Sequence, residues 1–210
     1  MTISKSNTKP RKRPKQDRSR ETVKAILQAS AHILERDGIS KFTTNRIAEK
    51  AGVCISSLYQ YFPNKQAVLN SLLQDYFSRQ DRQILEYLEK AKSNNYEPLK
   101  GLEGLLDVMC DYNERLPQAS RVMLMEAKKL GIESEVERLD AIFIEKLEKH
   151  LRFYSDKLRH KDYFTLAFFI MYALQGINHA FLSGKGQGKI TQRKMKKELA
   201  ILCYRYLFVE

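Results

Sequence analysis

Apolar side chains recur at helical spacing along most of the chain. In the first such stretch, residues 19–37, Ile26, Ile33 and Leu34 fall on one face of a helix, and Gly38 follows where that helix would end. The same spacing predicts helices at about residues 65–91, 98–117, 118–129, 133–158, 162–182 and 191–208. The sequence contains no strand-like alternation and no internal repeat. It therefore predicts an all-α protein.

Two further, very short helices are predicted between residues 43 and 61, joined by a glycine turn. Thr43 or Thr44 can cap the first of them. Gly52 stands where the chain must leave this helix, a position that favours a left-handed backbone. The small Ala48 lets the two helices cross closely, at the steep angle of a helix-turn-helix. This arrangement is typical of a DNA-reading unit.

The second short helix, about residues 55–61, is too short to be stable alone, so its neighbours must hold it. Its outward residues carry hydroxyl, amide and phenol groups, and none of them is acidic. Such groups suit hydrogen bonds to phosphates and base edges. Asn64 can cap the next helix, and Lys65 places a cation in its first turn, against the helix dipole. A phosphate docked at that helix end would explain the cation; the alternative is a solvated lysine.

This region resembles the DNA-binding signature of the TetR (tetracycline-repressor-like) family of bacterial transcriptional regulators. The residues that carry the resemblance are Thr43, Thr44, Ile47, Ala48, Ala51, Gly52, Val53, Leu58, Tyr59, Tyr61, Phe62, Asn64 and Lys65. The resemblance covers about residues 19–73. The rest of the chain is similar to the family only in its length and helical character.

The resemblance also implies roles for individual residues. It implies phosphate contacts at Thr44, Tyr59, Tyr61 and Lys65, and base-edge contacts at Asn45, Ile55, Ser56, Ser57 and Gln60. Arg46 can serve either purpose. Cys54 and Ile55 stand where family members often carry small or polar residues. Ile55 can therefore either touch a thymine methyl group or only pack against its neighbours.

Charge is concentrated at the same end of the chain. The net charge is +12, and residues 1–70 hold 14 Lys and Arg against 5 Asp and Glu. Such an imbalance favours a polyanionic partner. Residues 1–17 lack apolar periodicity and are expected to be a disordered basic arm, either solvated or following DNA. We predict a three-helix DNA-binding head at residues 18–66 and an effector-binding and dimerisation domain at 67–210.

The predicted helix 162–182 is unusually apolar. No Asp, Glu, Lys or Arg occurs between residues 163 and 183, close to the roughly 20 residues that span a bilayer. Polar residues such as Gln175 interrupt the stretch, so we predict burial at a subunit interface. The resemblance implies a two-fold homodimer with a four-helix interface built from helices 162–182 and 191–208. The alternative is that these helices form only the core of a monomer.

Several apolar, aromatic and amide side chains in the second domain are candidates for a small-molecule pocket. They are Met109, Tyr112, Asn113, Met123, Phe143, Phe168, Tyr172 and His179. Each can equally be a core residue, but the resemblance implies an effector cavity in this domain. Methionine favours an adaptable apolar site, which suggests a hydrophobic effector. Binding would then shift the long helix 65–91 and change the separation of the two heads.

Other function classes find little support in the sequence. Paired carboxylates, a Ser-His-Asp arrangement, a phosphate loop after a strand and metal-ligand spacing are all missing, so we predict no enzyme, metal or cofactor. Three scattered cysteines fit a reducing cytoplasm, and no apolar run follows the basic N-terminus. A membrane-surface role lacks a basic amphipathic helix.

The sequence therefore predicts a cytoplasmic transcriptional regulator that binds a double-stranded DNA operator. We expect a repressor that a small, hydrophobic molecule releases from its operator. The alternative is a DNA-binding architectural or partner-recruiting factor without a small-molecule effector.

Overall fold

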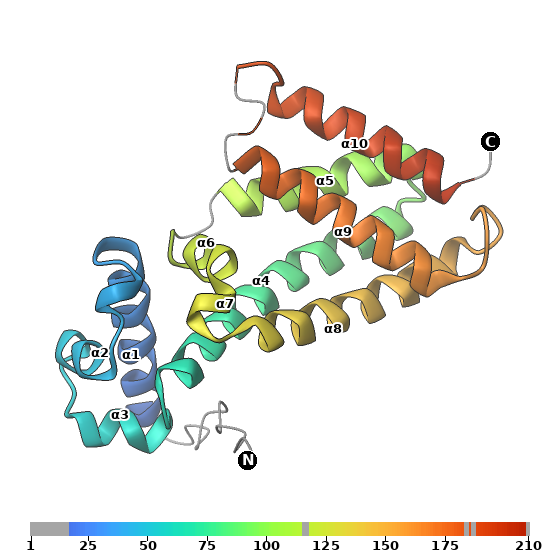
Figure 1. Cartoon of the computed structure of the whole chain (residues 1–210). Coiled ribbons are helices and arrows are strands. Elements are labelled where there is room, and N and C mark those ends of the chain that lie inside the picture. Colours follow the sequence, from blue (N-terminus) through green and yellow to red (C-terminus); the bar gives the residue numbers. More distant parts are fainter. Residues whose placement is uncertain (1–16, 115–117, 183–184, 186–187, 209–210) are drawn as a thin grey trace, which may run out of the picture. The chain divides into compact units, whose positions relative to one another are not determined.

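The structure is a computed structural model that describes residues 17–114, 118–182, 185 and 188–208. Its helices are α1 (Asp17–Arg36), α2 (Thr44–Ala51), α3 (Ile55–Tyr61), α4 (Lys65–Ser93), α5 (Pro98–Glu114), α6 (Gln118–Met125), α7 (Ala127–Leu130), α8 (Glu133–Leu151), α9 (Tyr163–Leu182) and α10 (Gln192–Leu207), with short 3-10 turns η1 (Ile39–Lys41) and η2 (Arg152–Tyr154) (Figure 1). Among the described residues, extended pairing is limited to one isolated bridge, between Leu158 and Phe208. The predicted all-α class is confirmed.

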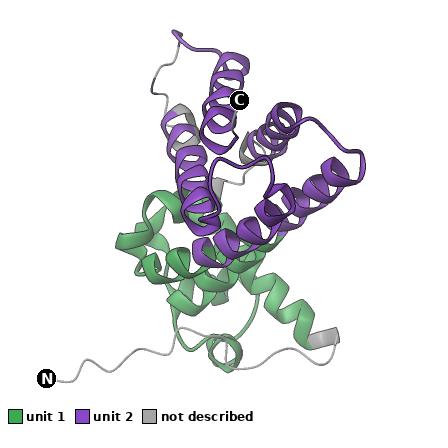
Figure 2. Cartoon of the chain, turned by 90° about the vertical axis from the view of Figure 1, so that its right-hand side faces the viewer, with its two compact units in different colours: residues 1–78, 116–139 green, residues 79–115, 140–210 purple. Residues whose placement is uncertain are grey.

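The chain forms two compact units (Figure 2). Unit 1 comprises residues 1–78 and 116–139, and unit 2 comprises residues 79–115 and 140–210. Helices α4 and α8 each contribute residues to both units. The predicted arm lies outside the described residues, except for Asp17, at which α1 begins. The functional division into residues 18–66 and 67–210 stays a prediction.

The core of unit 1 explains why such short helices fold. The helices α1 and α2 pack together, and α3 packs on α2. Each contributes at least one side chain that is almost entirely buried. These side chains are Ile26, Ile33 and Leu34 from α1, Ile47 from α2 and Leu58 from α3, with Phe42 and Phe62 from the adjoining turns. Helix α6 also packs against α1 and belongs to the same unit.

One predicted helix is divided in the structure, and another ends earlier than its apolar periodicity indicated. The predicted helix 118–129 is divided into α6 and α7 at Glu126, whose backbone lies at φ −115° and ψ 22°. The predicted helix 133–158 ends at Leu151. Leu158 continues the apolar spacing, but it is buried because the chain turns back there to pair with Phe208. Periodicity alone does not distinguish these two ways of burying a leucine.

Unit 2 is built around α5, α9 and α10. The helix α10 packs against both α5 and α9. One face of α9 is buried in this core through Leu166, Ala167, Ile170, Met171 and Leu174. The opposite face exposes the aromatic side chains of Phe164, Phe168, Phe169 and Tyr172. Helix α9 therefore has apolar residues on both of these faces, and the described part of the chain covers only one.

Candidate nucleic-acid interface

The first short helix of unit 1 begins and ends as its sequence predicts. Thr43, rather than Thr44, is the N-cap of α2, because its side-chain oxygen accepts a hydrogen bond from the Arg46 backbone N–H at 3.3 Å. Gly52 follows the helix in the left-handed region, at φ 67° and ψ 30°. The Val53 N–H then bonds to the Ala48 carbonyl at 3.0 Å, which closes the turn toward α3.

Helix α3 is held by one deeply buried side chain. Leu58 is fully buried, and the rest of this seven-residue helix reaches solvent. The ten predicted DNA contacts are all accessible. Asn45, Arg46, Ile55, Ser56, Tyr59, Gln60 and Lys65 are exposed, and Thr44, Ser57 and Tyr61 are half-buried. The structure thus brings these residues to the surface of α2, α3 and the start of α4, while their individual contacts to DNA stay predictions.

One hydrogen bond links α2 to α3, and another caps α4. The Thr44 and Tyr59 hydroxyls lie 3.1 Å apart, which links the first turn of α2 to α3. Asn64 accepts a hydrogen bond from the Ala67 backbone N–H at 2.9 Å and so caps α4. The first turn of α4 carries no acidic side chain, so Lys65 has no counter-charge in that turn. Both features suit the approach of phosphate groups.

Cys54 is the N-cap residue of α3 and lies next to several predicted DNA contacts in the sequence. Its sulfur lies 3.1 Å from the Ser56 hydroxyl oxygen and 2.9 Å from that of Ser57. These hydroxyls stabilise a thiolate and lower the pKa of Cys54 to about 7. By contrast, burial raises the pKa of Cys203 to about 11. Cys54 is therefore exposed and easily ionised, and Cys203 is neither.

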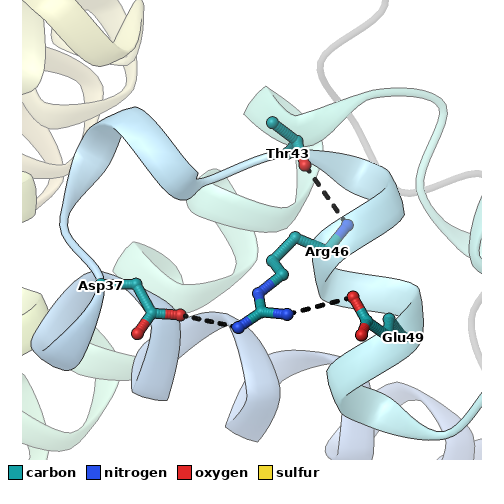
Figure 3. A network of polar contacts seen from close by, with 4 residues as sticks. All are labelled: Asp37, Thr43, Arg46 and Glu49. Carbon is teal, nitrogen blue, oxygen red and sulfur yellow. Dashed lines mark hydrogen bonds and ion pairs between the residues drawn. The ribbon is translucent and has the colours of Figure 1, made fainter.

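Arg46 takes part in a network that the sequence does not reveal (Figure 3). Its guanidinium donates a hydrogen bond to Glu49 at 3.1 Å and lies 3.6 Å from an Asp37 carboxylate oxygen. The hydrogen bond to Glu49, followed by the two negative charges, raises the pKa of Arg46. Asp37 directly follows α1 and Glu49 lies on α2, so the pairing joins two elements of unit 1.

Unit 2 contains a small cavity of about 60 Å³. It is lined by Leu88, Ala91, Tyr96, Pro98, Gly101, Leu102, Leu105, Leu147, His150, Leu151, Tyr154, Ile170, Leu207 and Phe208. The rings of His150 and Tyr154 lie 5.5 Å apart. Burial lowers the pKa of His150 and raises that of Tyr154, while Glu89 and Lys92 act on His150 in opposite directions. Both rings are therefore uncharged at neutral pH, and apart from these two residues and Tyr96 the lining is apolar.

Five of the eight predicted effector residues have described side chains, and none of these five lines this cavity. Met109 is buried in the core of unit 2 and Phe143 packs against that core, while Phe168 and Tyr172 are 39% and 41% exposed on α9. Met123 is buried in unit 1. The side chains of Tyr112, Asn113 and His179 lie outside the described residues. The predicted set stays a prediction. His150 and Tyr154 were missed because a helical face with both aromatic and apolar residues has the same pattern as a core.

Among the described residues, no group of His, Cys, Asp or Glu has the arrangement of a metal site. No helix in this part of the chain is long and apolar enough to cross a membrane.

Comparison with known proteins connects both units to one family. Residues 26–72 match the family model described as bacterial regulatory proteins of the tetR family, and residues 100–207 match the tetracyclin repressor-like C-terminal domain. Relatives include the nucleoid occlusion factor SlmA of Vibrio vulnificus, 30% identical over 60% of this chain and 63% of the relative. The SlmA of Aliivibrio fischeri is 33% identical over 56% of this chain and 59% of the relative. The chain thus spans somewhat less than two thirds of these relatives.

Solved structures with the same fold cover nearly the whole chain. The fatty acid degradation regulator FadR from Bacillus halodurans has a TM-score of 0.67 and 17% identity, over 91% of this chain and 96% of its own. SmeT, the repressor of the Stenotrophomonas maltophilia multidrug efflux pump SmeDEF, has a TM-score of 0.66 and 18% identity, over 90% and 93%. The second family model alone matches more than half of the sequence. The chain belongs to the tetR family of bacterial regulatory proteins.

Proposed function

We propose that this regulator binds a DNA operator as a repressor and leaves it when a small apolar molecule binds in unit 2. The proposal rests on two features that occur in one chain. Helix α3 exposes several polar side chains, and unit 2 contains an apolar cavity that is lined partly by residues of α4. SmeT, which has the same fold, is itself named as a repressor. The protein would work in the cytoplasm, where its DNA lies, and would catalyse no reaction.

On the DNA side, α3 enters the major groove in this proposal. Ser56 and Gln60 project from its exposed surface toward base edges, and Tyr59 and Lys65 contact phosphates. Leu58 anchors the helix, because its complete burial fixes which residues face outward. Seven residues can read only a few base pairs, so useful specificity requires two copies of the head on neighbouring half-sites.

The second copy would pack against α9 and α10. Phe164 and Phe169 on α9 are 56% and 57% exposed, and Leu202 on α10 is 54% exposed. The ring of Phe169 lies 5.8 Å from that of Tyr206, so the apolar surface continues from α9 onto α10. A contiguous apolar patch of this kind is typical of an interface. A two-fold arrangement would bury the same patch on both subunits.

The effector would bind in the unit 2 cavity. Its walls are aliphatic and aromatic, and the uncharged His150 and Tyr154 offer hydrogen bonds. These features suit an apolar molecule with one uncharged polar group. Leu88 and Ala91 belong to α4, a helix that is continuous from Lys65 to Ser93. A ligand that displaces this end of α4 would change the separation of the two heads and so break their register with the DNA.

The DNA-binding part can be tested with duplexes selected from a random library. Wild-type protein should bind a selected duplex at least about 10³-fold tighter than random DNA at the same salt concentration. The selected sequences should contain two related half-sites about one helical turn apart, or a multiple of this. Selection of no preferred sequence, with weak and steeply salt-dependent binding, would contradict the proposal.

The effector part needs a separate experiment. Apolar compounds that raise the melting temperature should also release the selected duplex, and Leu102→Phe, which narrows the cavity, should abolish both effects. Leu99→Phe, the same substitution on the same helix at a residue outside the lining, serves as the control. Compounds that stabilise the protein without changing its affinity for DNA would contradict effector-controlled release.

The relatives named nucleoid occlusion factors favour a second candidate function. In this case the protein would bind DNA and recruit a partner without responding to a small molecule. The same duplex selection would succeed, but no apolar compound would change DNA affinity. The effector experiment therefore distinguishes the two candidates.

A further inference from the structure

Arg46 differs from the other predicted DNA contacts, because its charge is already paired. Its side chain is 45% exposed, yet its guanidinium lies beside Glu49 at 3.1 Å and Asp37 at 3.6 Å (Figure 3). The three side chains together carry a net charge of −1. A phosphate would meet more negative than positive charge at this place. Arg46 in this arrangement does not add to the cationic surface that attracts DNA.

The position of Arg46 along α2 also requires an explanation. Its backbone N–H bonds to the Thr43 cap, so Arg46 lies in the first turn of the helix. The helix dipole disfavours a cation there, and no acidic residue occupies that turn. An arginine placed before a glutamate along the helix is also the weaker orientation of such a pair. The local structure of α2 alone would therefore not favour arginine, and a partner outside the helix has to offset these costs.

Asp37 is that partner. Its carboxylate oxygen Oδ2 is buried and has no hydrogen bond within the described residues, and the Arg46 guanidinium is the cation paired with it. The Asp37 backbone is fixed at the end of α1, because its N–H bonds to the Ile33 carbonyl at 2.8 Å. The planar guanidinium of Arg46 holds its two terminal nitrogens in fixed directions, so that one faces Glu49 and the other faces Asp37, whereas a lysine ammonium is a single point charge on a flexible stem.

We infer that Arg46 is a positioning residue that ties α2 to the end of α1, and so sets the angle at which α3 meets the operator, without contacting DNA itself. The inference rests on the DNA-binding function. It makes Asp37, an acidic residue in a basic head, a determinant of tight operator binding. Removal of its negative charge then weakens binding, which is the opposite of the effect that electrostatics alone would produce.

The test compares variants on a duplex selected by the wild-type protein and on random DNA, over a salt series. Arg46→Met removes the charge but keeps much of the aliphatic stem, and Asp37→Asn removes the partner. Each should weaken operator binding by about threefold per head, or about tenfold for two heads, as expected for exposed ion pairs. Random DNA should be bound almost as before. The Arg46→Met/Asp37→Asn double variant should be no weaker than the weaker single variant.

Three controls separate positioning from contact. Lys65→Met should lower the slope of log affinity against log salt by about 1.8, as expected for one phosphate contact in each of two heads, whereas Arg46→Met should leave it unchanged. Glu35→Gln removes the same charge as Asp37→Asn, two residues earlier, and should not weaken binding. Arg46→Lys should resemble Arg46→Met, because the charge is kept but the bridge is lost.

Several results would overturn the inference. A reduced salt slope for Arg46→Met, with equal losses on operator and random DNA, would make Arg46 a phosphate contact. Tighter binding by Asp37→Asn than by Glu35→Gln would show that Asp37 only restrains Arg46 from DNA. Unchanged operator affinity in both Arg46→Met and Asp37→Asn would show that this pair has no role in operator binding. Melting curves of each variant identify any loss that comes from unfolding, and specific binding by the wild type tests the DNA-binding function separately.

Discussion

At the scale of single residues, Gly104 illustrates how closely α4 and α5 approach within unit 2. A Cβ atom at this position would lie 2.1 Å from the Tyr87 hydroxyl oxygen. That hydroxyl donates a hydrogen bond to the Gly101 carbonyl at 3.1 Å, so the ring is fixed over α5. A Cβ atom added at Gly101, one turn earlier, would meet no neighbouring atom within 4 Å. The two glycines therefore serve different purposes.

We expect Gly104→Ala to lower the free energy of unfolding by about 1–3 kcal/mol, because Tyr87 must move and lose its hydrogen bond. The matched variant Gly101→Ala should raise it by up to about 1 kcal/mol through helix propensity. Urea denaturation followed by circular dichroism measures both. Equal effects of the two substitutions would show that the Tyr87 contact does not restrict α5.

Cys54 gives a second prediction at this scale. Because the Ser56 and Ser57 hydroxyls lower its pKa to about 7, its alkylation rate should rise with pH and reach half its maximum near pH 7. Ser57→Ala should move this midpoint to higher pH. Cys203 should not react in the folded protein, since it is buried and its pKa is raised to about 11. Mass spectrometry after timed iodoacetamide treatment distinguishes the two thiols. A Cys54 midpoint at or above pH 8.5 would contradict the effect of the hydroxyls.

At the scale of elements, the sequence was sufficient to predict the caps and the turn around α2 and α3. It was not sufficient to predict contacts between residues that lie farther apart in the chain. Thr43, Gly52 and Asn64 act through neighbours within five residues, so their capping and turn roles follow from the sequence. The Arg46–Asp37 pair, in contrast, depends on how the end of α1 folds back toward α2, and η1 is too short to produce a periodic pattern.

The same limit applies in unit 2. The apolar spacing at Leu158 indicated more helix than exists, because burial in a turn and burial on a helix produce the same pattern. The cavity lining was missed for a similar reason. His150 and Tyr154 lie one turn apart near the end of α8 and in η2, and only the tertiary structure brings Phe208 to them. The spacing of residues along the sequence does not indicate that Phe208 lies beside them.

The turn at Gly52 gives a prediction for an element as a whole. Its left-handed backbone costs an L-residue about 1 kcal/mol, although space for a side chain is available. Gly52→Ala should therefore destabilise the head by about that amount, and Gly52→Asn by less, since asparagine tolerates this region. Thermal melting measures both variants. If Ala and Asn were equally tolerated, backbone strain would not determine the choice of glycine here.

At the scale of the whole molecule, the two functions proposed for the chain depend on separate sets of residues. The predicted DNA contacts on α2, α3 and the start of α4 belong to unit 1, and the cavity and the exposed aromatic face of α9 belong to unit 2. Helix α4 has residues in both units, and it also supplies Lys65 to the proposed interface and Leu88 to the cavity. A regulator needs this kind of continuity, because a ligand can change DNA affinity only through an element that both sites influence.

Dimerisation through α9 gives the last prediction. Phe169→Glu should convert the protein to a monomer, because it places a charge at the centre of an apolar patch that a second copy would bury. Phe153→Glu is the matched control, since Phe153 is 54% exposed but lies in η2, outside that face. Sedimentation velocity should give a dimer for the wild type and the control, and a monomer for Phe169→Glu.

The monomer should also bind the selected duplex much more weakly, because one head contacts only one half-site. Its affinity for a single half-site should remain close to that of a wild-type head, since unit 1 is unchanged. A Phe169→Glu protein that stays dimeric would place the interface elsewhere. A monomer that binds the full operator as tightly as the wild type would mean that one head supplies the whole specificity, and the exposed aromatic face of α9 would then require a different partner.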